Sequence, residues 1–116
     1  MSDSKMLADY SVTCSAAVKP TFPEPGLTRR MGSYNEKLCL VEHRMAKDWV
    51  GGRHSHPHDQ VVYVVSGRLK IILGDESFEV GAGDSFVVKG GIEHQASAME
   101  ESLVIDIFNP CRLDYV

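Results

Sequence analysis

The sequence lacks the features of several large protein classes. None of its apolar runs is long enough to span a membrane, so no membrane partner is expected. Residues 1–20 have no apolar core preceded by positive charge, so no secretory signal is expected either. Basic residues are in the minority, 12 Lys and Arg against 16 Asp and Glu, and they form no basic block. The net charge of −4 therefore argues against nucleic acid as a partner, and a basic residue in a site would meet a small anion.

Cysteines are few, odd in number and far apart. Cys14, Cys39 and Cys111 fit neither a disulfide framework nor a zinc site of CxxC type. We therefore expect a reduced, cytoplasmic protein. The chain of 116 residues is long enough for one core and is predicted to form one domain.

Two segments divide the chain. Residues 1–25 have little apolar periodicity and end in three prolines, which predicts an N-terminal tail or a segment that covers a sheet edge. Residues 26–116 are predicted to be the folded domain. Near its start, Arg29 and Arg30 form a basic pair. We interpret the pair as a solvated edge, the alternative being that one of them reaches an anionic ligand.

Short β-branched and aromatic runs follow one another from residue 38 onward, and helical periodicity is absent from residue 34 onward. The predicted strands are 38–45, 61–65, 69–73, 76–80, 85–89 and 104–108. Gly74 and Asp75 would form a two-residue hairpin turn. Many short strands with glycine turns indicate an all-β antiparallel barrel or sandwich.

Histidines gather at one place in the sequence. His54 and His56 point the same way on an extended backbone, and Gln60 follows four residues later. With His94 as a ligand from elsewhere in the chain, these side chains could bind one divalent metal ion, for which Ni, Fe, Mn, Co or Zn suit the donors. The alternative is that the histidines line a barrel mouth and bind no metal. His58 is expected beside the site, as a partner of a ligand.

Two other polar positions lie in apolar strands. His43, in the strand 38–45, is interpreted as a surface or satisfied side chain and is left out of the site. Asp106, in the strand 104–108, either faces solvent or points into a wet pocket, because a carboxylate on a barrel strand is costly unless it is paired or solvated. Phe108 shares the parity of Asp106. Arg112 follows a proline bend and could clamp a carboxylate, or else form a surface ion pair with Asp114.

Two motifs carry a family resemblance. The pattern Gly51-x-x-His54-x-His56-x-x-x-Gln60, followed by Gly67, resembles the first cupin motif, and residues 83–94 resemble the second. Most cupins have Glu at the position of Gln60 and Pro at that of Lys89. The C-terminal pattern Asp106-x-Phe108-x-Pro110-x-Arg112-x-Asp114 narrows the resemblance to the KdgF family of pectin- and alginate-degradation cupins.

This resemblance implies a fold and a function. The fold would be a cupin-type antiparallel β-barrel, also called a double-stranded β-helix or jelly roll. The function would be a lyase- or isomerase-type reaction, the metal-dependent opening of 4,5-unsaturated monouronates to the linear 5-keto-4-deoxyuronate. Asp106 would point inward as the catalytic acid or base, and Arg112 and Phe108 would bind a small anionic sugar. A homodimer is also implied.

Three alternatives remain open. The chain could be a small cupin dioxygenase, although Gln60 in place of Glu gives less anionic support to an oxidised metal. It could be a different sugar isomerase or lyase that uses the same ligands. It could also be a non-enzymatic sugar-binding cupin, which would bind sugars without turnover.

Overall fold

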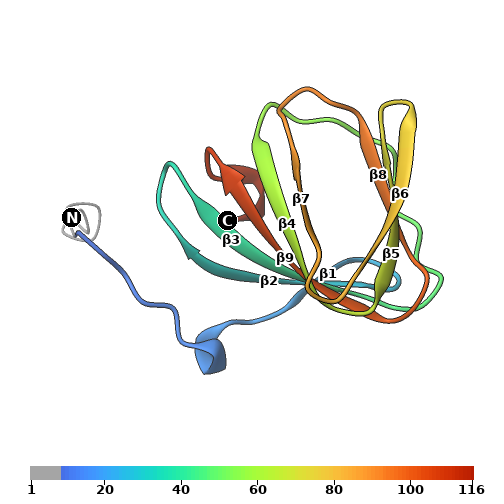
Figure 1. Ribbon diagram of the computed structural model, residues 1–116. Helices are drawn as coiled ribbons and strands as arrows, with labels where there is room; N and C mark the ends of the chain where they lie inside the picture. The colour runs from blue at the N-terminus through green and yellow to red at the C-terminus, as the bar shows by residue number, and fades with distance from the viewer. Residues whose placement is uncertain (1–8) are drawn as a thin grey trace.

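The structure, a computed structural model, describes residues 9–116 and consists of two antiparallel β-sheets that face each other. The strands of this part of the chain are β1 (Thr21–Glu24), β2 (Leu27–Tyr34), β3 (Cys39–Met45), β4 (Asp59–Ser66), β5 (Arg68–Leu73), β6 (Glu76–Gly81), β7 (Ser85–Val88), β8 (His94–Ala98) and β9 (Ser102–Asn109). One sheet has the order β1-β2-β3-β9-β4-β7 and the other the order β6-β5-β8 (Figure 1). Among these residues no helix is long and apolar enough to cross a bilayer.

Strand alternation determines which side chains face the interior. Along β9, Val104, Asp106 and Phe108 are buried, whereas the intervening Ile105 and Ile107 are more exposed. Because successive side chains point to opposite faces of a strand, one face of the six-stranded sheet forms the inner wall of the barrel. Asp106 is thereby placed inside the barrel. Of the two orientations that the sequence left open for this side chain, the structure has the inward one.

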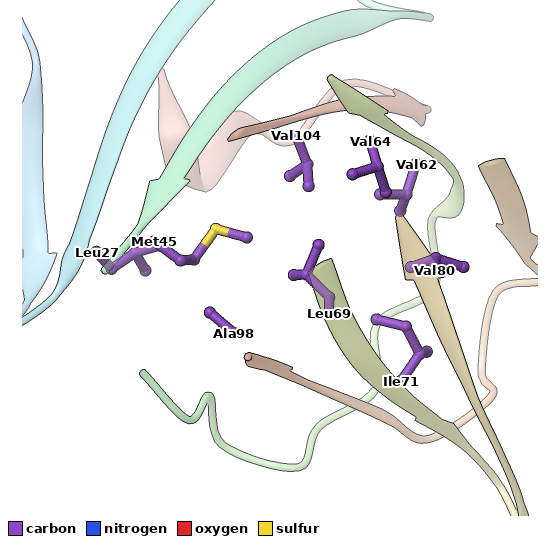
Figure 2. Close-up of a cluster of buried hydrophobic side chains, with 9 residues drawn as sticks. All are labelled: Leu27, Met45, Val62, Val64, Leu69, Ile71, Val80, Ala98 and Val104. Atoms are coloured by element: carbon purple, nitrogen blue, oxygen red, sulfur yellow. The ribbon is translucent and has the colours of Figure 1, made fainter. Parts of the chain in front are cut away.

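The core lies between the two sheets. Figure 2 shows Val62, Val64 and Val104 of the six-stranded sheet facing Leu69 and Ile71 of the three-stranded sheet. All five side chains are buried, and burying an aliphatic side chain of this size contributes roughly 1.5–3 kcal/mol. This apolar cluster fills one part of the barrel interior. The polar residues described below lie in the rest of the interior, beside the cluster.

The corner between β4 and β5 is where the chain passes from one sheet to the other. Gly67 lies there with a φ of 91°, in the left-handed region that favours glycine. A Cβ at this position would lie 2.2 Å from the Ser102 hydroxyl oxygen and 2.5 Å from the Glu101 carbonyl oxygen. The crossing therefore requires glycine for both its backbone conformation and its close approach to the start of β9.

The all-β fold is confirmed, and all six predicted strands are present with shifts of up to two residues at their ends. Three strands were missed: β1, β2 and β8. β2 carries Arg29, Arg30 and Gly32, and β8 (sequence HQASA) has no β-branched residue, so neither has a strong strand pattern. β1 lies at the edge of the six-stranded sheet, within the predicted tail, whereas residues 1–8 lie outside the described residues. The boundary at residue 26 remains a prediction.

Candidate metal centre

Backbone pairing brings the first and the last predicted ligand together. His54 and His94 form an isolated antiparallel bridge, in which each backbone N–H donates to the other residue's carbonyl oxygen, at 3.0 and 2.8 Å. Their ring centroids are 4.4 Å apart. The ring of His56 lies 5.7 Å from that of His54 and 4.8 Å from that of His94. Two imidazoles from one loop and a third from about 40 residues later in the sequence thus form one cluster.

Each of the three rings is oriented by a backbone carbonyl two residues away. The Nδ1 atoms lie 2.9, 3.0 and 2.9 Å from carbonyl oxygens, in the pairs His54–Gly52, His56–His58 and His94–Ile92. A carbonyl oxygen can only accept, so each Nδ1 carries the proton and each Nε2 keeps a free lone pair in the neutral ring. One ring nitrogen from each histidine lies within 4.8 Å of the other two. This arrangement can hold a metal ion.

Burial favours the neutral form of two of these rings, those of His56 and His94. Loss of solvent lowers the pKa of His56, and the positive charge of Arg112 lowers it further, against the hydrogen bonds that raise it. Burial likewise lowers the pKa of His94. The neutral imidazole is the form that binds a metal, so the environment of both rings favours binding at neutral pH.

Gln60 completes the donor set. Its Oε1 lies 3.0 Å from His56 Nε2, and its Nε2 donates to Asp106 Oδ1 at 2.9 Å. The amide oxygen therefore faces an unprotonated ring nitrogen, and two lone pairs at this distance repel each other unless a cation lies beside both. Turning the amide round would instead direct its oxygen at the carboxylate. The hydrogen-bond network lacks one donor at this point, and a bound cation fits the residues present.

Asp106 is the centre of a buried polar network. Its side chain is buried, and Gln60 Nε2 and His43 Nδ1 donate to its two oxygens, the latter at 2.6 Å. Arg29 Nε in turn donates to His43 Nε2 at 3.0 Å, which places the ring proton of His43 on Nδ1, toward the carboxylate. The two donors hold the carboxylate in one orientation next to the candidate metal ligands.

His43 is a site residue that the sequence interpretation left out. It shares the parity of Cys39, Val41 and Met45 along β3, and all four side chains are buried. The alternation of apolar residues in the strand was the signal that could have placed His43 inside. The interpretation of Arg29 as part of a solvated edge was also wrong, because Arg29 lines the internal cavity.

The C-terminal residues cover one side of the network. Arg112 donates from Nε and Nη2 to the two carboxylate oxygens of Asp114, at 3.0 and 2.8 Å, while its Nη1 is buried without a partner among the described residues. The ion pair with Asp114 was the alternative considered for Arg112. Phe108 is buried and packs edge-on against His56, with ring centroids 5.6 Å apart. The ring of His58 lies near both, and His58 holds His56 through its backbone carbonyl.

Tyr115 contacts two guanidinium groups. The Cζ atoms of Arg29 and Arg112 lie over its ring, 3.6 and 4.1 Å from the ring centroid. Burial raises the pKa of Tyr115, so the phenol stays protonated at neutral pH. This stacking fixes the C-terminal 3₁₀ turn, Leu113–Tyr115, against the polar network.

A cavity of about 150 Å³ opens beside these residues. Its polar lining consists of Arg29, His43, Gln60, His94, Gln95, Asp106 and Tyr115. The rest of the lining is apolar and belongs to the core. Pockets for drug-sized ligands are roughly 300–1,000 Å³, so this cavity suits a molecule of single-ring size.

Comparisons with known proteins agree with this geometry. The family model for the cupin domain matches residues 41–108. The pectin degradation protein KdgF of Dickeya dadantii (strain 3937) is 30% identical over 93 residues, which are 78% of this chain and 84% of that protein. The solved structure of KdgF from Halomonas sp. is 34% identical, with a TM-score of 0.87, and the match covers 92% of this chain and 99% of that one. An RmlC-like cupin from Shewanella frigidimarina NCIMB 400 is 30% identical, with a TM-score of 0.87 and coverage of 93% and 97%.

Proposed function

This chain belongs to the cupin family, and within it to the KdgF family, and from this membership we propose that it opens the ring of 4,5-unsaturated monouronates. One relative is named for pectin degradation, whose products include such sugars. The observation that carries the proposal is the inward carboxylate of Asp106, held beside three converging histidines and Gln60.

The proposed reaction is an isomerisation that balances without a co-reactant. The anomeric hydroxyl loses its proton, the bond between C1 and the ring oxygen breaks, and C1 becomes an aldehyde. The electron pair of the broken bond stays on the former ring oxygen, which leaves an enolate at C5. Protonation of C4 then gives the linear 5-keto acid. The reaction needs a base, stabilisation of negative charge on oxygen, and an acid.

His54, His56, His94 and Gln60 are the residues proposed to hold a divalent ion. When bound, the ion supplies positive charge that stabilises negative charge developing on substrate oxygens. Its ligands would be neutral, so they leave its charge uncompensated and favour an anionic substrate. The identity of the metal stays open among Ni, Fe, Mn, Co and Zn.

Asp106 is proposed to move the proton. As a carboxylate it can take the proton from the anomeric hydroxyl, and as the acid it can return that proton to C4. His43 and Gln60 donate to its oxygens and hold it at the cavity wall.

Phe108 and Arg112 remain proposed substrate-binding residues, in a narrower sense than the sequence suggested. Phe108 supports His56 by packing against it. Arg112 uses two of its nitrogens on Asp114, so only its buried Nη1 is free to donate to a ligand. The fork geometry that recognises a carboxylate at two points is thus engaged within the protein.

We also propose a homodimer and a cytoplasmic location. The outer face of the six-stranded sheet supports the first, because Leu40, Ile107, Val61 and Val87 lie in register across β3, β9, β4 and β7 and are all exposed. An apolar row of this kind is a candidate surface for a second copy of the chain. The three free cysteines support a reducing compartment. Light scattering of the purified chain tests the dimer.

The test of function is turnover of an unsaturated monouronate, measured as loss of the absorbance of its C4–C5 double bond. Metal-loaded and chelated protein are compared, together with Asp106→Asn and the exposed turn variant Asp75→Asn as a matched control. We expect metal-dependent turnover in the native protein and in Asp75→Asn, and a loss of at least about 100-fold in Asp106→Asn, since acid–base groups typically contribute that much.

Four results would contradict the proposal in different ways. Full activity of Asp106→Asn would remove the proton-transfer role. No acceleration by protein with metal demonstrably bound would remove the reaction itself. Oxygen uptake in place of isomerisation would favour the dioxygenase, and tight binding without turnover would favour a sugar-binding protein.

A further inference from the structure

We propose that Arg29 is the residue that binds the carboxylate of the ligand in the cavity, and that it makes this cavity selective for uronates over neutral sugars. The inference rests on the proposed function for the class of ligand. It assigns to β2 a role that the sequence motifs of the family do not cover, because those motifs begin at Gly51.

Arg29 is held in place by two contacts. Its Nε donates to His43 Nε2 at 3.0 Å, and its guanidinium lies over the Tyr115 ring, with Cζ 3.6 Å from the ring centroid. Within residues 9–116, Nη1 and Nη2 of Arg29 have no acceptor, and no carboxylate forms an ion pair with this residue. The edge of the guanidinium with two parallel donors is therefore free and already oriented, which suits a bidentate carboxylate.

The cavity brings Arg29 and the reacting groups to one shared space. Arg29, Asp106 and His94 all line the same space of about 150 Å³. His43 lies between Arg29 and Asp106 and bonds to both. A monouronate carries its carboxylate on C5 and its anomeric hydroxyl on C1, the two carbons that flank the ring oxygen. With the carboxylate of the ligand on Arg29, the rest of its ring would extend toward Asp106 and the histidine cluster.

The other two arginines in this region are already engaged. Arg112 uses Nε and Nη2 on Asp114, which is the interaction expected of a carboxylate-binding fork. Arg30, the next residue of β2, points to the other face of the strand, where it bonds to Glu42 and to the backbone carbonyl and hydroxyl of Ser15. Of the three guanidinium groups, that of Arg29 alone combines a place on the cavity wall with two free terminal nitrogens.

The experiment compares two non-reacting ligands on metal-loaded protein. Saturated galacturonate has the ring and the carboxylate but no C4–C5 double bond, and galactose is its neutral parent. Dissociation constants for both are measured by calorimetry with native protein, Arg29→Met, Arg29→Lys and the matched control Arg30→Met. Thermal unfolding and metal titration of each variant confirm that the barrel and the metal centre are intact.

We expect native protein and Arg30→Met to bind galacturonate better than galactose. Arg29→Met should bind galacturonate about 10- to 100-fold more weakly, the effect of losing charge-assisted hydrogen bonds, with galactose unchanged. Arg29→Lys should be intermediate, because lysine keeps the charge and loses the planar fork. Loss of structure alone would weaken both ligands equally, so the ratio of the two constants is the deciding value.

Failure of this inference can be told apart from failure of the proposed function. The inference is overturned if Arg29→Met keeps the native preference for galacturonate, if it weakens both ligands equally, or if native protein shows no preference. None of these outcomes depends on turnover. Conversely, a preference that disappears in Arg29→Met would stand even if unsaturated uronate were bound and not converted.

Discussion

Replacing Gly90 with alanine should weaken metal binding, although Gly90 is not a ligand. A Cβ at this position would lie 2.2 Å from the carbonyl oxygen of Pro57 and 2.8 Å from its carbonyl carbon. Pro57 lies between His56 and His58, in the loop that carries the candidate metal ligands His54 and His56. Ordinary van der Waals contact begins at about 3.4 Å, so one of the two backbones must move by about 1 Å.

The size of the loss in metal affinity follows from the two hydrogen bonds that this backbone movement would stretch. The Gly91 N–H donates to the His56 carbonyl oxygen and the Gly90 N–H to Asp59 Oδ1, both at 2.8 Å. These bonds hold the loop of His56 against the turn that precedes His94. Disturbing the partners of metal ligands typically costs about 10- to 100-fold in affinity, and overpacking costs about 1–3 kcal/mol of stability. We expect Gly90→Ala to show both losses.

The assay is a titration of zinc or nickel in competition with a chromophoric chelator, together with thermal unfolding of the metal-free protein. Gly52→Ala is the matched control: a Cβ at Gly52 would have nothing within 4 Å, and its carbonyl still accepts from His54. The control should bind metal like native protein. If Gly90→Ala has native affinity and a native unfolding midpoint, the close approach to Pro57 does not position His56 and the reasoning is refuted.

Four further predictions address charge, thiol chemistry and packing. Gln60→Glu places a second carboxylate beside Asp106, so the metal-free variant should unfold about 5 °C below metal-free native protein. The rise in its unfolding midpoint on adding metal should exceed that of native protein. An unchanged metal-free midpoint would contradict this prediction. In native protein at pH 8 a chromogenic disulfide reagent should modify the exposed Cys14 before the two buried thiols, because burial raises the pKa of Cys111 to about 11 and the thiolate is the reactive form. Since that thiol has a pKa of 9.0 in the unfolded chain, its contribution to stability is full below pH 9 and should be lost as the pH rises toward 11, which denaturant titrations at several pH values would detect. Val64→Ala, in the fully buried core, should lower the free energy of unfolding by about 2–3 kcal/mol, whereas Val61→Ala, on the exposed face of the same strand, should lower it by less than about 1 kcal/mol, and equal losses would refute the assignment of the two faces.

Much of the fold and the metal centre could be predicted because the determining residues are local. The β-branched and aromatic runs in β4 and β9 identify two strands, although the sequence leaves open which face of β9 is buried. The spacing of His54, His56 and Gln60 depends on one loop and the strand after it. His94 needed one long-range assumption, which the bridge to His54 satisfies.

The rest of the site depends on neighbours across the sheet, which a single sequence does not display. His43 looked like an isolated polar residue, yet its position in β3 pairs with Val104 of β9 and Arg29 of β2. Arg29 and Arg30 are adjacent in the sequence and lie on opposite faces of β2. Because β2 has no strong strand pattern, its parity could not be read from the sequence. The same holds for Arg112, whose preference for Asp114 is set by the fold of the C-terminal turn.

The candidate ligands belong to opposite sheets, since His94 begins β8 of the three-stranded sheet and Gln60 lies in β4 of the six-stranded one. An ion held by both would act as a cross-link at the end of the barrel away from the apolar core. A ligand that binds only the folded state adds about 2.7 kcal/mol at a free concentration of 100 times its dissociation constant. Amide exchange at the start of β8 would then slow with metal loading, and the metal supply of the cell would govern how long the folded protein resists proteolysis.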